Sequence, residues 1–77
     1  MVRVCGIDPG MSGAIAFADI SPTGEISNAS VHDIPLADLG DGVDKKGDPK
    51  LSPDARAIRA LILAENPDWV ILEKAVI

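Results

Sequence analysis

The chain has 77 residues, with 12 acidic and 7 basic side chains and a formal net charge of −5. This balance lacks the basic clusters that usually hold nucleic-acid phosphates, so these residues alone do not predict a DNA-binding surface. Cys5 is the single cysteine, which excludes an internal disulfide and, without a Cys/His cluster, a structural zinc site. The length allows one small domain or a piece of a larger one.

The N-terminal segment does not read as a targeting signal. Its apolar run is short and is soon interrupted by Asp8, unlike a secretory signal peptide. No stretch approaches the length of a transmembrane helix. A lone cysteine in an apolar run is typical of a buried, reduced thiol. We therefore expect a soluble, cytoplasmic protein with no membrane partner.

The first third of the chain predicts three strands. Residues 2–8 are apolar on both faces, which is typical of a strand buried on both sides, and the run ends at Asp8. Residues 14–20 place larger apolar side chains on one face and alanines on the other, where a helix could approach closely. Residues 25–34 alternate more loosely, with Ile26 as the core signal, and predict an edge strand. Turns rich in Pro and Gly separate the three.

Residues 35–51 have no period and are rich in Gly, Asp and Lys, so they predict a long loop. Its lysines, Lys45, Lys46 and Lys50, could contact DNA. Three aspartates offset them, which favours a solvated loop.

A helix is predicted next, with Ser52 as its cap and Pro53 in its first turn. Its buried stripe is formed by Ile58, Leu61 and Ile62 and is extended by Ala55 and Ala64. Arg56 and Arg59 lie on the solvent-exposed face of the helix. Asn66-Pro67 ends it. Residues 68–73 predict a fourth strand that ends at Glu73, with Trp69 anchoring the helix against the sheet.

The order β-β-β-α-β predicts an α/β fold with a mixed sheet. Short turns make the first three strands antiparallel, and the helical crossover makes the fourth strand parallel to the first. The two-sided apolar patterns place the fourth strand beside the first, which gives the strand order 3-2-1-4. Asp8 and Glu73 then end two neighbouring parallel strands at the same sheet edge.

Two carboxylates at this spacing suit a divalent cation. Adjacent strands lie about 4.8 Å apart, so the two acids can share one cation or hold two. Oxygen ligands at an open edge favour Mg²⁺ or Mn²⁺ over zinc. A single acid at a strand end is more often a solvated loop residue, but here two converge. Asp8 and Glu73 are therefore the candidate catalytic and metal-binding residues.

Two segments carry a resemblance to a known family. Residues 4–17, which read VCGIDPGMSGAIAF, resemble the opening motif of the RuvC family of Holliday junction resolvases, especially its phage-type members. Residues 70–74, which read VILEK, are similar to the family's second motif, in which a glutamate ends the fourth strand. Lys74 stands where Gln is common in cellular members. The element order agrees along the whole chain, although only these two segments are specific.

The resemblance implies an RNase H-like fold and a crossover junction endodeoxyribonuclease of DNA recombination and repair in a bacterial or phage-infected cell. It implies two Mg²⁺ or Mn²⁺ ions, with Asp8 bridging them and Glu73 holding one, and a homodimer acting on branched DNA. The family has further acidic ligands and a DNA-binding helix beyond the matching region. Residues 1–77 would thus be the N-terminal part of a single RuvC-like nuclease domain, inactive as a fragment.

Two other functions remain open on the sequence. The first is a nucleotide-binding domain of the actin, sugar-kinase and heat-shock ATPase type, which shares an Asp-x-Gly hairpin after its first strand. There hydroxyl residues usually follow, whereas Met11 follows Gly10 in this chain. The second is a non-catalytic module that binds a partner chain. Gly10 and Gly13 could let a phosphate approach the backbone, but they also simply permit the turn.

Overall fold

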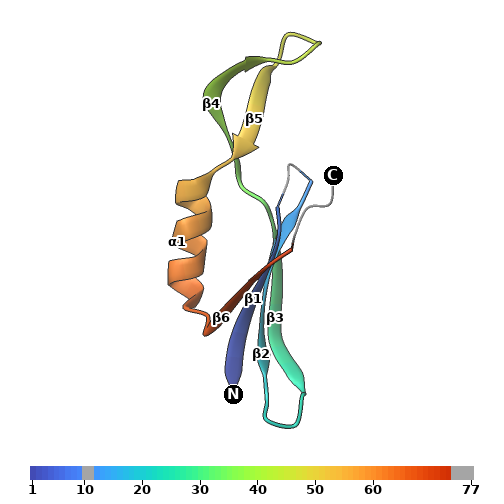
Figure 1. The fold of residues 1–77 in the computed structure, drawn as a ribbon, viewed down its shortest axis with the longest axis vertical. Helices are drawn as coiled ribbons and strands as arrows, with labels where there is room; N and C mark the ends of the chain where they lie inside the picture. The colour runs from blue at the N-terminus through green and yellow to red at the C-terminus, as the bar shows by residue number, and fades with distance from the viewer. Residues whose placement is uncertain (10–11, 74–77) are drawn as a thin grey trace.

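The computed structural model describes residues 1–9 and 12–73, with the backbone only at Asp41. Figure 1 shows a small α/β arrangement with a main sheet, one helix and a separate hairpin. The elements in chain order are β1 (Val2–Asp8), β2 (Ala14–Ile20), β3 (Ile26–Asp33), β4 (Leu36–Val43), β5 (Pro49–Pro53), α1 (Ala55–Glu65) and β6 (Trp69–Leu72). Within the described residues, no helix is long and apolar enough to cross a membrane.

The main sheet has the predicted strand order. Its four strands run β3-β2-β1-β6, with β1 antiparallel to β2 and parallel to β6. β3 is an edge strand, as its polar composition predicts. The coarse prediction of an α/β fold with a mixed sheet is thus confirmed.

The helix covers one face of this sheet (Figure 1). The buried core beneath it consists of Cys5, Ile15, Phe17 and Ile34, so the cysteine is a buried free thiol as expected. The predicted helix stripe is confirmed for the three residues that pack on this core, Ile58, Leu61 and Ile62. Ala55 and Ala64 are exposed, so the predicted extension of the stripe was wrong.

The opposite face of the sheet is not covered by the described residues. Side chains alternate along a strand, so Cys5 on the helix side places Gly6 and Asp8 on the other side. The alanines of β2 are also on that side, because Ala16 pairs with Gly6. No helix of the described residues packs on those alanines, although their small size would allow one to approach closely.

Two predicted core residues are exposed. Trp69 pairs with Val4 and so faces away from α1; it is 66 % exposed and does not anchor the helix. Ile26 begins the edge strand and is 69 % exposed. Ile34, which follows β3, occupies the core position instead.

The segment predicted as a loop is a β-hairpin. β4 and β5 pair antiparallel as a second sheet, and the register shifts between Asp38 and Val43. Gly40 and Gly42 adopt positive φ within this irregular stretch, where glycine is tolerated without strain. These two residues weakened the strand signal in the sequence.

The cap of α1 differs from the predicted one. Asp54 is the N-cap, and its Oδ1 accepts hydrogen bonds from the backbone N–H groups of Arg56 and Ala57 at 3.1 and 3.2 Å. Ser52 and Pro53 belong to β5 rather than to the helix. The C-terminal end is as predicted, because Asn66 takes the left-handed conformation and its N–H reaches Ile62 O.

Arg3 ties three elements together on the helix side of the sheet. Its guanidinium bonds Asp19 on β2 at 3.0 Å and Glu65 at the end of α1. The same group lies 5.8 Å from the centre of the Phe17 ring, within the range of a cation–π contact. Hydrogen bonds to Glu65 and then Asp19 raise the pKa of Arg3 above its ordinary value. Arg3 therefore closes the N-terminal end of the core.

This cluster makes stability depend on acid. The amide of Asn28 and then the Arg3 guanidinium lower the pKa of Asp19 from its ordinary value of 3.8. A carboxylate with a lowered folded-state pKa stabilises the fold above its unfolded pKa, and this contribution is lost as pH falls through the folded value. We therefore expect Asp19→Asn to lower the urea midpoint at neutral pH, and the difference from the unmodified chain to shrink as the pH falls below 3.8 through the lowered pKa of Asp19.

The control for this prediction is Asp33→Asn, which removes the same charge from the other face of the sheet. It is expected to leave the urea midpoint at neutral pH nearly unchanged. A deficit in Asp19→Asn that persists undiminished in acid would contradict the role given to the carboxylate charge.

Candidate metal-binding edge

Asp8 and Glu73 meet at one edge of the main sheet. Asp8 is the last residue of β1, and Glu73 directly follows β6. The two strands pair in parallel as far as Ile7 and Leu72, and the N–H of Glu73 donates to the carbonyl of Ile7 at 2.8 Å. This hydrogen bond continues the pairing by one residue and places Glu73 beside Asp8. The predicted juxtaposition is confirmed for the backbone.

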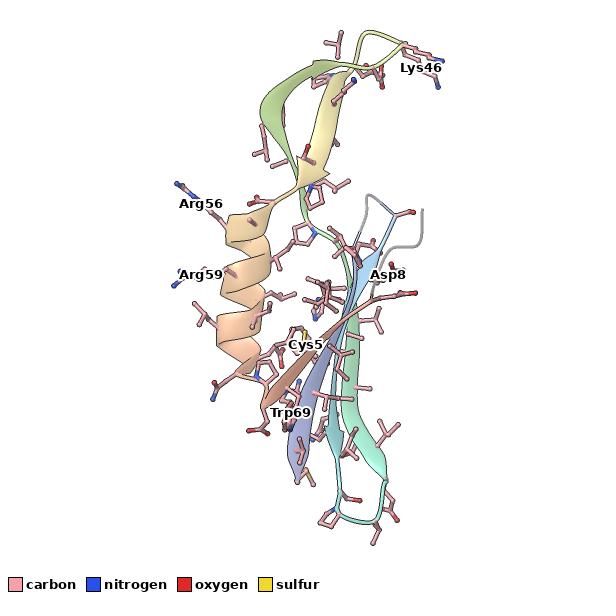
Figure 2. The ribbon with its side chains drawn as sticks, in the orientation of Figure 1. Cys5, Asp8, Lys46, Arg56, Arg59 and Trp69 are labelled. Carbon is pink, nitrogen blue, oxygen red and sulfur yellow. The ribbon has the colours of Figure 1, made fainter. Side chains whose placement is uncertain are left out.

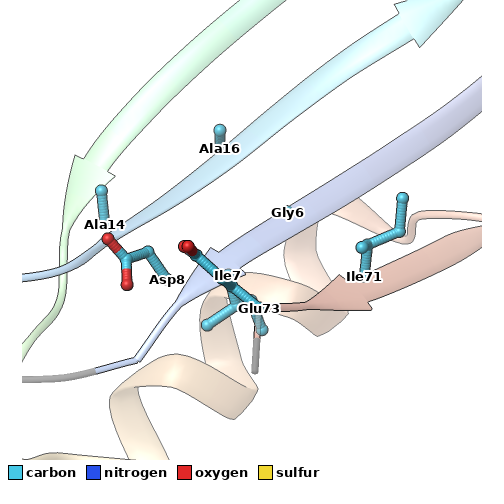
Figure 3. Close-up of a pocket in the computed structure, with 7 residues that line it drawn as sticks. All are labelled: Gly6, Ile7, Asp8, Ala14, Ala16, Ile71 and Glu73. Atoms are coloured by element: carbon cyan, nitrogen blue, oxygen red, sulfur yellow. The ribbon is translucent and has the colours of Figure 1, made fainter. Parts of the chain in front are cut away.

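Both acids belong to the sheet face that lies opposite α1. Figure 3 shows them at an open hollow that the structure forms on this face. The floor of the hollow is made of small residues, Gly6, Ala14 and Ala16, with Ile71 on the side of β6. A Cβ placed on Gly6 would meet no atom within 4 Å, so the floor is flat and unobstructed. A ligand of some size can therefore reach the two carboxylates.

The carboxylates of Asp8 and Glu73 are exposed. Within residues 1–9 and 12–73, neither carboxylate accepts a hydrogen bond or forms an ion pair. Two like charges on neighbouring strands about 4.8 Å apart repel each other unless a cation lies between them. The local chain thus offers both acids as free oxygen ligands, which is the donor chemistry that Mg²⁺ and Mn²⁺ prefer.

Among residues 1–9 and 12–73, the acids that line the hollow at this edge are Asp8 and Glu73. The described part of the chain contains no group of three or more His, Cys, Asp or Glu side chains that could hold a metal. Asp8 and Glu73 could therefore supply only part of the six-oxygen shell that Mg²⁺ takes, with the rest coming from water, substrate or other protein groups.

A third acid lies on the same face and was missed from the sequence. Asp33 pairs with Ala14, which in turn pairs with Asp8, so Asp33 stands two strands from Asp8 along one row of the sheet. It does not line the hollow. Its place at the end of the third predicted strand was the available signal, and the intervening strand keeps it separate from the pair.

Other residues singled out in the sequence fall outside this edge. Gly13 is buried, and its carbonyl accepts a hydrogen bond from the N–H of Ile34 at 3.2 Å, which fits a structural role in the turn. Gly10, Met11 and Lys74 lie outside the described residues. His32 faces the core, where its ring makes an edge contact with Phe17 at 5.9 Å between ring centres.

Comparison with known protein families, with curated proteins and with solved structures finds no match to this chain.

Proposed function

We propose that this chain supplies the catalytic edge of a divalent-metal-dependent endodeoxyribonuclease that cuts four-way DNA junctions in recombination and repair. The observation that supports the proposal is the parallel pairing of β1 and β6, which brings Asp8 and Glu73 together on one accessible face. The resemblance of residues 4–17 and 70–74 to the RuvC motifs adds the substrate class and an RNase H-like fold. The strand order β3-β2-β1-β6 is compatible with that fold.

The chemistry follows from the ligands. Asp8 and Glu73 would be the protein ligands of the divalent metal, as the resemblance implies. Bound Mg²⁺ or Mn²⁺ would supply an activated water and charge stabilisation for the leaving 3′-oxygen. In the reaction, the water oxygen bonds to phosphorus in line with the breaking P–O3′ bond, and the water proton ends on solvent or the leaving oxygen. The flat floor beside the acids leaves room for the phosphodiester.

Residues 1–77 are not expected to cut DNA by themselves. Two carboxylates hold a divalent ion weakly, and a two-metal site needs more protein ligands than the described residues provide. We propose that further acids complete the site in the natural gene product that contains these residues. We also propose that this product acts as a homodimer, because two symmetric sites can cut the two strands of a symmetric junction.

The test uses the natural gene product and a four-way junction labelled at one 5′ end. We expect paired cuts in Mg²⁺ and none in EDTA, and no cutting by residues 1–77 on their own. A linear duplex of the same sequence serves as the control substrate and is expected to remain mostly intact. An intact junction together with measurable ATP binding would instead support the nucleotide-binding alternative.

A further inference from the structure

The cations of this acidic chain are unevenly distributed. Arg3 is held in ion pairs with Asp19 and Glu65. The other described cations form no ion pair within residues 1–9 and 12–73, and all of them lie between residues 45 and 59, where acids number only two. They are Lys45, Lys46, Lys50, Arg56 and Arg59. The hairpin that carries the three lysines also carries four aspartates, Asp38, Asp41, Asp44 and Asp48, so its lysines are a local group of cations on an element without net positive charge.

These cations fall into two groups that point in different directions. Arg56 and Arg59 project from α1 away from the main sheet, as Figure 2 shows. Lys46 lies at the tip of the β4–β5 hairpin, next to Lys45 in the turn, and Lys50 is on β5. The lysines are thus carried by the hairpin, and the arginines lie on a separate surface.

The hairpin projects past the edge at which β1 ends (Figure 1). The radius of gyration is 15.0 Å and the longest extent is 51 Å, whereas a compact chain of this length would have a radius of gyration of roughly 11–12 Å. At its base the hairpin is held to the body, because Leu36 packs against the core and the N–H of Asp54 donates to Pro35 O at 2.7 Å. It is an anchored arm beyond the Asp8–Glu73 edge.

Two aspartates of the arm, Asp38 and Asp44, accept backbone hydrogen bonds that stabilise its turns. Oδ1 of Asp44 accepts hydrogen bonds from the N–H groups of Lys46 and Asp48 at 2.8 and 3.0 Å. Oδ1 of Asp38 accepts one from Gly40 at 3.0 Å. Backbone N–H groups that bind a carboxylate offset part of its charge. Among the residues whose side chains the structure describes, the lysine ammonium groups have no internal partner and are available to an external anion.

We propose that the β4–β5 hairpin is a DNA-contacting arm, in which Lys45 and Lys46 bind backbone phosphates of a duplex whose scissile phosphate lies at the Asp8–Glu73 edge. This inference rests on the proposed nuclease function and extends it to substrate positioning. Phosphate contacts fix the register of a protein on DNA without reading its sequence. The arm lies beyond the Asp8–Glu73 edge and carries lysines that form no ion pair within the described residues, so it is placed to contact the DNA backbone.

The test compares two double variants of the natural gene product, Lys45→Ala/Lys46→Ala and Arg56→Ala/Arg59→Ala. Each removes two exposed cations, so the arginine pair is a matched control for net charge. Fluorescence anisotropy with a labelled four-way junction in EDTA measures binding without cleavage. At about 0.1 M salt we expect the lysine pair to weaken binding by roughly one to two orders of magnitude and to reduce the salt slope by about two. The arginine pair should change both much less.

Equal effects of the two double variants, or no effect of the lysine double variant, would contradict the proposal that the hairpin contacts DNA. If cleavage still requires Asp8 in that case, the nuclease proposal stands and only the DNA-contacting role of the hairpin is rejected. If the unmodified protein binds neither junction nor duplex, both proposals fall. Circular dichroism of each variant shows that the fold is retained, which is expected because none of the four side chains makes an internal bond in the described residues.

Discussion

Replacing Asp8 with Asn is expected to lower the rate of junction cleavage by the natural gene product at least about a hundredfold. Loss of a group that merely orients a metal ligand commonly costs 10–100-fold, so loss of a direct ligand costs at least as much. Asn keeps the size of the side chain but removes the charge that a divalent cation requires. Single-turnover cleavage of a labelled junction at saturating Mg²⁺ measures the effect.

Asp33→Asn is the matched control, because Asp33 shares the face and the edge but lies two strands away from Asp8. Its cleavage rate should stay close to that of the unmodified protein. Glu73→Gln should behave like Asp8→Asn, since Glu73 is the neighbouring ligand. A cleavage rate that survives Asp8→Asn would show that the acids of this edge do not carry the chemistry.

Replacing Phe17 with Ala is expected to remove a large part of the chain's stability. Phe17 is 1 % exposed and is the largest of the fully buried side chains. Truncating a buried Phe costs about 3–5 kcal/mol, whereas a chain of this length is stable by only roughly 4–12 kcal/mol. The substitution also removes the cation–π contact with Arg3 and the edge contact with the His32 ring. Urea unfolding followed by circular dichroism measures the loss.

Val31→Ala is the control for this substitution, since Val31 is 72 % exposed on the uncovered face. Its free energy of unfolding should change by no more than about 0.5 kcal/mol. If Phe17→Ala kept the urea midpoint of the unmodified chain, the core would not lie between α1 and the main sheet as described.

The strand order and the meeting of Asp8 with Glu73 could be predicted because they depend on connection lengths and strand direction. Two short turns and one helical crossover leave few arrangements of the main sheet. Placing β6 beside β1 then follows from their apolar patterns, and the terminal acids follow from the placement. The nuclease activity is a further step that rests on the resemblance, and it remains a prediction.

The hairpin could not be predicted from local signals. Gly40, Gly42 and several aspartates disfavour strands, so residues 36–43 lack the β-branched pattern that marks a strand. Their pairing with β5 is established by backbone hydrogen bonds, which leave little trace in composition. The lysines consequently looked like part of a solvated loop, and their place on an arm was not visible.

Long-range side-chain contacts were also missed. Arg3 bonds Asp19 and Glu65, which are 16 and 62 residues away, and no spacing rule connects them. Trp69 was misassigned because apolar residues on both faces of a strand predict two covering layers, whereas the described residues supply a helix on one face. Ser52 was predicted as the cap of α1, whereas Asp54 accepts the N–H bonds.

The central claim is that Asp8 and Glu73 hold a divalent ion jointly. A crystal soaked in Mn²⁺ and measured at the manganese absorption edge tests it most directly. The account predicts an anomalous peak at the C-terminal edge of β1 and β6, about 2.0–2.4 Å from a carboxylate oxygen of each residue. The absence of any peak bound by both acids under saturating Mn²⁺ would contradict it.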